Sequence, residues 1–344
     1  MKNKNSKKMI INFVLFLSLI LLTLWILLKD QDAQEIFNII GTSNGFFIAI
    51  GILAMFIYIS LEAINIGRTL KLLGNKTNFF KNLKYAFIGM FFSGITPAAS
   101  GGQPMQIYFM HKDGLTVGHS TLALLINLTS MQITTLSIAL ISIIFNYKYL
   151  NTMLIILLSI GIFLNATALT FLLVSIFSKR LSRWFMKALI RIMKFFRIKN
   201  MDKKIKKIGK ELRSYQKSSK YIKKHKKMMV KILFTTILQF LIYYSVAYWT
   251  YRALGLNSHN IIEIITIQSL LFATVSGIPS PGSVGISEGI FVEIFRHCYP
   301  ENMIRSATLL NRGISFYIFM AISGIVVVTN QILKNRKKKE EKLW

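Results

Sequence analysis

The feature that most limits the fold of this chain is a series of long segments without any charged side chain. Eight of them contain 20 or more residues and no Asp, Glu, Lys or Arg. Each is long enough to cross the roughly 30 Å hydrocarbon core of a bilayer as an α-helix. The eight segments are residues 9–28, 36–61, 85–110, 114–147, 149–178, 232–251, 264–287 and 313–333.

The composition agrees with a membrane location, because 53% of the 344 residues are hydrophobic and only 16% are charged. Lipid offers backbone groups no hydrogen-bond partner, so only helices and closed barrels cross it, and these segments lack the alternation of barrel strands. We therefore predict an all-α integral membrane protein, a polytopic helical bundle. Residues 9–28 exceed the length of a signal-peptide core and no A-x-A site follows, so we expect a retained helix.

Basic residues set the expected orientation of the bundle. The formal net charge is +30, and residues 179–231 alone hold 21 Lys and Arg against two acidic residues, a net charge of +19. The amino end, residues 67–84 and the carboxyl end also carry an excess of basic residues. The positive-inside rule places all four segments in the cytoplasm. We therefore expect a multi-pass protein of the bacterial plasma membrane with both termini in the cytoplasm.

This orientation requires two apolar segments to begin and end on the same side of the membrane. Residues 85–110 start and finish in the cytoplasm, whereas residues 259–300 start and finish outside. Two arms of about 12 residues each reach roughly 18 Å, which is close to the midplane. We predict a re-entrant hairpin at about 85–110, and a second hairpin with longer arms at about 259–300 that enters from the opposite face.

The two hairpins share a sequence pattern. Residues 93–102 (SGITPAASGG) and 276–285 (SGIPSPGSVG) align without a gap and are identical at five of ten positions. Interrupted helices at corresponding positions of two halves are typical of transporters built from inverted repeats. We predict two inverted halves, residues 1–178 and 232–344, each with a broken hairpin. Residues 179–231 join them as a basic cytoplasmic loop.

Helix breaks at these positions expose unpaired N–H groups near the membrane interior, where a phosphate or carboxylate would satisfy them. The alternative is that Gly and Pro only kink the helices. An ion pair between Glu288 and Arg312 would lower the cost of burying both and either clamp a phosphate or serve the structure alone. The candidate lipid- or phosphate-binding residues are Thr96, Pro97, Ser100, Gly101, Gly102, Gln103, Pro281, Gly282, Gly285, Glu288 and Arg312, with Glu62, Arg68 and Arg305 as secondary candidates.

Other kinds of site receive no support from the sequence. The five histidines show no metal-ligand spacing, Cys298 is the single cysteine, and no phosphate-binding G-x-x-x-x-G-K-[ST] motif is present. No His or Asp is placed to activate the serines near the breaks. We predict no catalytic residue, metal or cofactor.

The basic loop has the pattern of a membrane-surface element. Residues 181–196 place apolar side chains at helical spacing with basic side chains on the other side, and a polybasic stretch at 203–231 follows. Such segments bind anionic lipid. A nucleic-acid partner such as tRNA is the alternative, but no binding module accompanies the charge, so we favour membrane anchoring.

Residues 96–104 (TPAASGGQP) and 281–288 (PGSVGISE), together with Arg312, resemble the transmembrane region of lysylphosphatidylglycerol synthases. Ser283 stands where glycine is common in that family. The family includes the flippase half of bacterial multiple peptide resistance factors and stand-alone proteins linked to other lipids or to polyprenyl carriers. The resemblance implies translocation of an anionic or aminoacylated phospholipid, such as phosphatidylglycerol or lysyl-phosphatidylglycerol, across the plasma membrane.

The resemblance leaves several alternatives open. One is phosphatidylglycerol lysyltransferase activity, which in bifunctional members resides in a soluble carboxyl-terminal domain, so we expect none from this polypeptide without a separate synthase. Others are translocation of a polyprenyl-phosphate carrier and a scaffold role for the basic loop. The expected partners are the phospholipid substrate, anionic lipids at the basic loop, a separate synthase and a second copy of the chain.

Overall fold

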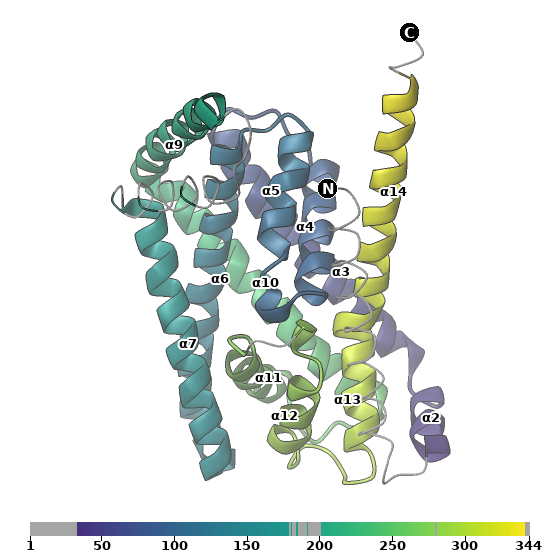
Figure 1. The fold of residues 1–344 in the computed structure, drawn as a ribbon. Helices are drawn as coiled ribbons and strands as arrows, with labels where there is room; N and C mark the ends of the chain where they lie inside the picture. Colours follow the sequence, from purple (N-terminus) through teal and green to yellow (C-terminus); the bar gives the residue numbers. More distant parts are fainter. Residues whose placement is uncertain are drawn as a thin grey trace.

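The structure, a computed structural model, describes residues 33–178, 180, 184, 191, 201–278 and 281–340. All regular structure in these residues is helical (Figure 1). Five helices are long and apolar enough to cross a membrane, which confirms the prediction of a polytopic helical membrane protein. They are Gly45–Leu72, Val117–Tyr149, Thr152–Ile176, Lys226–Ala253 and Ile304–Ile332.

The remaining helices are short or lie in the basic part of the chain. The predicted first span at 9–28 and most of the amphipathic segment at 181–196 fall outside the described residues. The elements are α2 (Ala33–Gly41), α3 (Gly45–Leu72), α4 (Phe79–Gly94), η1 (Pro97–Ala99), α5 (Gly102–Lys112), α6 (Val117–Asn146), η2 (Tyr147–Tyr149), α7 (Thr152–Phe177), α9 (Met201–Lys224), α10 (Lys226–Ala253), α11 (Ile261–Val275), η3 (Pro281–Ser283), α12 (Ile286–Ile294), α13 (Ile304–Arg312), η4 (Gly313–Tyr317) and α14 (Ile318–Glu340).

Short polar residues determine where several helices begin. The side chains of Asn44, Asn78, Asn151 and Asn260 accept hydrogen bonds from backbone N–H groups in the first turns of α3, α4, α7 and α11. Thr116 does the same for α6. These caps satisfy donors that have no partner inside the helix, and they separate the apolar segments into distinct helices.

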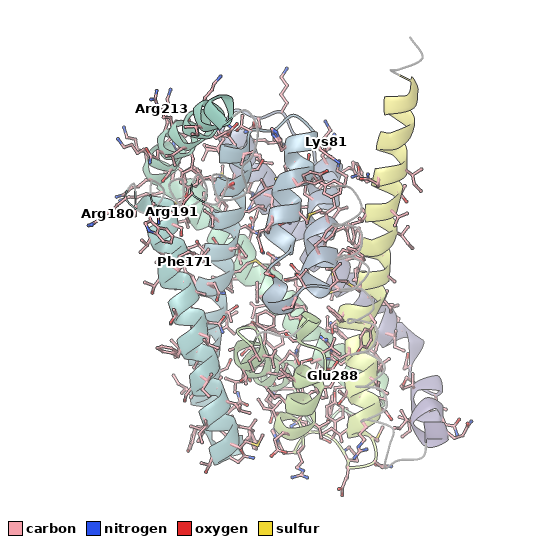
Figure 2. All side chains as sticks on the ribbon, in the orientation of Figure 1. Lys81, Phe171, Arg180, Arg191, Arg213 and Glu288 are labelled. Carbon is pink, nitrogen blue, oxygen red and sulfur yellow. The ribbon has the colours of Figure 1, made fainter. Side chains whose placement is uncertain are left out.

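Basic side chains gather at one end of the bundle, which we call the basic end. Lys81, Arg180, Arg191 and Arg213 all lie in the upper part of Figure 2. Helices α4 and α5 occupy the same end, whereas α11 and α12 lie in the opposite half of the bundle (Figure 1). The two hairpins therefore extend from opposite ends of the molecule. That their halves are related by inverted symmetry stays a prediction.

Hydrogen bonds between long helices fix the bundle near its basic end. Helix α3 packs along α10, where the Asn65 amide donates to Thr236 Oγ1 at 3.0 Å and the Arg68 guanidinium donates to the Lys231 carbonyl at 3.3 Å. Helix α9 is held against α6 by Glu211, whose carboxylate accepts from the Gly118 N–H at 3.0 Å. Arg68, a secondary site candidate, thus ties two helices together.

The arms of both hairpins are short. The first is closed at its base by Asp113, whose carboxylate accepts from Lys84 Nζ at 2.5 Å and from the Tyr85 hydroxyl at 2.8 Å. In the second, α11 has 15 residues and α12 has nine. The arms of the first hairpin have 16 and 11 residues, so the second hairpin does not have the longer arms expected from the sequence. At 1.5 Å per residue even α11 reaches only about 22 Å.

Helix α7 approaches the second hairpin very closely. A Cβ atom at Gly161 would lie 2.5 Å from the Ala273 carbonyl oxygen and 2.8 Å from Thr274 Cα. One turn later, the Asn165 amide donates to the Ala273 carbonyl at 3.1 Å and to Ser276 Oγ at 3.0 Å. Glycine therefore lets α7 reach the carboxyl end of α11, where asparagine holds the start of the hairpin turn.

We expect Gly161→Ala to lower stability by about 1–3 kcal/mol, because the added methyl group meets backbone atoms that cannot rotate away. Thermal unfolding of the purified protein in detergent measures the change. The matched control is Gly209→Ala in α9, where no atom lies within 4 Å of the added methyl group. The control is expected to keep or slightly raise the melting temperature. Equal melting temperatures for the two variants would contradict the close packing of α7 on α11.

Candidate functional site

The tips of the two hairpins meet inside the bundle. Turn η1 contacts turn η3, although about 180 residues separate them in the sequence. Both tips contain left-handed backbone, with φ values of +54° at Ala99, +59° at Gly282 and +54° at Ser283. The helix breaks that the sequence places at Pro97 and Pro281 are therefore sharp turns, and they lie against one another.

In the first tip, Thr96 closes the turn between α4 and α5. Its hydroxyl donates to the Phe92 carbonyl at 2.6 Å and accepts from the Gly101 N–H at 2.9 Å. A side chain at Gly101 would meet Thr96, and one at Gly102 would meet Ser93. Both glycines therefore allow the start of α5 to pack closely against the end of α4. The N–H of Gly101 is therefore bonded within the protein, while no side chain caps the first turn of α5.

In the second tip, the Glu288 carboxylate is the centre of a hydrogen-bond network. One oxygen accepts from the Gly285 N–H at 2.8 Å and from Ser287 Oγ at 3.1 Å. The other accepts from Arg312 Nε at 2.9 Å and from the Tyr317 hydroxyl at 3.2 Å. Glu288 is 1% exposed, and its side chain extends from α12 to Arg312 and Tyr317 of the final helices (Figure 2). The ion pair expected from the sequence is present and buried.

Arg312 joins this network to the tip itself. Its Nη2 donates to the Gly282 carbonyl at 2.9 Å, and its guanidinium carbon lies 4.4 Å from the centre of the Phe316 ring. A side chain at Gly282 would overlap that ring, so the left-handed turn requires glycine here for space as well as for conformation. The π-helical segment η4 begins directly after Arg312, as is frequent at functional sites.

Two adjoining cavities lie beside the tips. The larger, of about 290 Å³, is lined by both hairpins and by α3, α6 and α10. The smaller, of about 140 Å³, lies next to Arg312. The two share Tyr243, Phe272, Ser276, Gly282, Ser283, Ser315 and Phe316. A mostly apolar cavity with a few polar side chains in its wall is the usual form of a ligand site.

Among the residues that the structure describes, Glu62 is the one charged residue that lines the larger cavity. The Gln106 amide nitrogen lies 3.5 Å from Glu62 Oε1 and donates more closely to the Tyr85 carbonyl at 3.1 Å. Gln106 fills the space over Gly89, where an added Cβ would overlap its amide. Glycine on α4 therefore lets an amide on α5 reach toward a carboxylate on α3.

The structure brings most of the predicted residues to this region. Gln103 and Gly282 line the larger cavity, Gly282 and Arg312 line the smaller one, and Glu288 holds Arg312. Thr96, Pro97, Ser100, Gly101, Gly102, Pro281 and Gly285 form the two turns. Arg305 is not among the residues that line either cavity, and Arg68 binds α10 instead.

Sequence reasoning missed Gln106, Asn127 and Tyr243, which also line the larger cavity. Gln106 and Asn127 are uncharged and lie outside the two breaks, so neither criterion selected them, although an amide within a long apolar segment is itself a signal. Tyr243 is not set apart in the sequence, because Phe240, Tyr244 and Tyr248 stand near it.

We expect Glu288→Gln and Arg312→Gln each to lower stability by about 3 kcal/mol or more, because each leaves an uncompensated buried partner. The double variant should lose less than the sum of the two. Thermal unfolding in detergent gives the three values. Glu293→Gln is the matched control, since Glu293 is partly exposed and accepts one hydrogen bond from Asn151. Strict additivity of the two single changes would show that the pair is not coupled.

Comparison with known proteins finds relatives that match nearly the whole chain. A UPF0104 membrane protein of Archaeoglobus fulgidus is 23% identical over 322 residues, which cover 92% of this chain and 96% of that protein. A UPF0104 membrane protein of Pyrococcus horikoshii is 24% identical over 302 residues, covering 85% and 88%. The pattern of the family described as the lysylphosphatidylglycerol synthase TM region matches residues 9–323. This chain belongs to that family of membrane proteins.

Proposed function

We propose that this protein translocates phospholipids across the membrane, with the head group passing through the larger cavity at the hairpin tips. The observation that carries the proposal is the position of that cavity. It is lined by both hairpins and three long helices, and the polar part of its lining includes Glu62, Gln103, Gln106 and Asn127. A polar head group in transit needs such a lining, because an unsatisfied polar group in hydrocarbon costs several kcal/mol.

We place the protein in the plasma membrane with its basic end in the cytoplasm. The charge distribution supports this orientation. Helices α9 and α10 begin with dense runs of lysine, and the last helix ends in another. Both the positive-inside rule and attraction to anionic lipid favour this side. In this orientation the first hairpin opens toward the cytoplasm and the second toward the outside.

The proposed substrate is a phospholipid with an anionic or aminoacylated head group, phosphatidylglycerol or lysyl-phosphatidylglycerol. The uncapped first turn of α5 at the tip favours a phosphate, because N–H groups and the helix dipole both attract an anion there. A lysyltransferase reaction is the enzymatic alternative. Incubation with lysyl-tRNA and phosphatidylglycerol separates the two, because a transporter forms no lysyl-lipid.

We expect Leu128→Trp to lower protein-dependent lipid translocation by about tenfold or more, a change of roughly 1.4 kcal/mol. Leu128 lines the larger cavity from α6, and the indole fills it without removing a polar group. The assay follows labelled phospholipid in liposomes that contain the purified protein. Leu140→Trp is the matched control on the same helix, since Leu140 is 54% exposed on the outside of the bundle.

The control is expected to translocate lipid at the rate of the unchanged protein. Equal rates for Leu128→Trp and Leu140→Trp would show that the head group does not use this cavity. Absence of protein-dependent translocation for every lipid tested would remove the proposal itself.

A further inference from the structure

The groups able to bind an anion at the hairpin tips are largely engaged within the protein. The Gly101 N–H is bonded by Thr96, and the Gly285 N–H by Glu288. The Arg312 guanidinium donates to Glu288 and to the Gly282 carbonyl. Its positive charge is matched by that of the buried carboxylate, so the pair adds little net charge to the tips.

Glu62 has the opposite character. Among the described residues it takes part in no ion pair, and the hydrogen bond it accepts from Gln106 is long, at 3.5 Å. A carboxylate in a membrane-spanning helix lowers stability unless a partner compensates it. Its presence in the cavity without a cation therefore points to a partner that comes with the ligand.

A second acceptor points to the same kind of ligand. Asn127 on α6 is 4% exposed and lines the larger cavity, and its Oδ1 atom has no hydrogen-bond partner within the described part of the chain. Its Nδ2 atom faces Met131 Sδ at 3.7 Å, so the amide oxygen is the end of the side chain left to bind. A donor supplied by a ligand in the cavity would satisfy this atom.

Aromatic rings form much of the remaining wall. Tyr58 lies one turn before Glu62 on α3, and its ring centre lies 5.0 Å from that of Tyr243. Tyr243 in turn lies 5.6 Å from Phe272, and all three rings line the cavity. One carboxylate among aromatic faces suits an organic ammonium group, which gains from cation–π contact. A hard metal ion instead requires six or more oxygen ligands.

The Glu62 carboxylate and the first turn of α5 line the same cavity. Gln103 in that turn and Gln106 three residues later both line it, and the Gln106 amide reaches toward Glu62 at 3.5 Å. The cavity therefore has a helix amino terminus and a carboxylate in its wall. A head group that carries both a phosphate and a nearby ammonium matches this pair of charges.

We propose that the larger cavity binds the protonated amine of a lipid head group through the Glu62 carboxylate, assisted by Asn127 Oδ1, and so selects amine-bearing phospholipids over amine-free ones. Of the two tests that follow, only the transport test depends on the proposed function; the binding test does not. It makes Glu62 a specificity-determining residue and leaves Glu288 and Arg312 as the support of the tip.

The transport test compares three acyl-labelled lipids in liposomes: phosphatidylglycerol, phosphatidylethanolamine and lysyl-phosphatidylglycerol. For Glu62→Gln, the rate for each amine-bearing lipid divided by the rate for phosphatidylglycerol should fall about tenfold, because loss of the charge removes the ion pair. Glu293→Gln is the matched control and should keep the ratio of the unchanged protein. An unchanged ratio in Glu62→Gln would overturn the inference while leaving lipid translocation standing.

A binding test in detergent stands apart from transport. Glycerophosphoethanolamine should raise the melting temperature of the unchanged protein and glycerophosphoglycerol should not, and Glu62→Gln should remove the difference. Ethylamine should raise the melting temperature less than glycerophosphoethanolamine does. An equal rise would assign the site to free amines and overturn its assignment to a lipid head group. Without ligand, Glu62→Gln should melt no lower than the unchanged protein, because it removes an unpaired charge. Equal stabilisation of both proteins by glycerophosphoethanolamine would overturn the inference.

Discussion

The Glu288 carboxylate is the interaction on which the second hairpin depends. Proline and left-handed glycine break the helix within the bundle, and the freed backbone groups need partners that lipid cannot supply. Glu288 binds the N–H of Gly285 at the start of α12, and through Arg312 it also holds the carbonyl of Gly282. One buried acid thus satisfies both sides of the break, and Arg312 compensates its charge.

The first hairpin solves the same problem with neutral groups. Thr96 bonds a carbonyl before the break and an N–H after it, so no charge is needed at the tip. The charged group of this half, Glu62, is not part of the turn, and among the described residues it accepts a hydrogen bond only from Gln106 of α5. The two intramembrane acids therefore differ in kind: Glu288 is fully bonded and structural, whereas Glu62 faces the cavity with most of its hydrogen-bonding capacity unused.

The sequence was informative where polarity alone decides the structure. Charge-free length predicts the membrane helices, and proline with glycine predicts the breaks at residues 97 and 281. The pairing of Glu288 with Arg312 followed from the cost of burying each alone. What the sequence did not reveal depends on packing between distant segments. No local pattern shows that η1 meets η3 or that Gly89 makes room for Gln106. Nor does one show that Arg68 binds α10.

The arrangement at the tips bears on how the cavity would change shape during transport. Among the described residues, the hydrogen bonds of Thr96 stay within the first hairpin, and those of Glu288 and Arg312 stay within the second half. Turn η1 contacts η3, and Ile95 of the first hairpin shares one buried apolar cluster with Val284 and Met320 of the second half. Parting the tips would then separate apolar surface and leave each internal network intact. A head group bound between them would replace that contact, so binding and opening would favour one another.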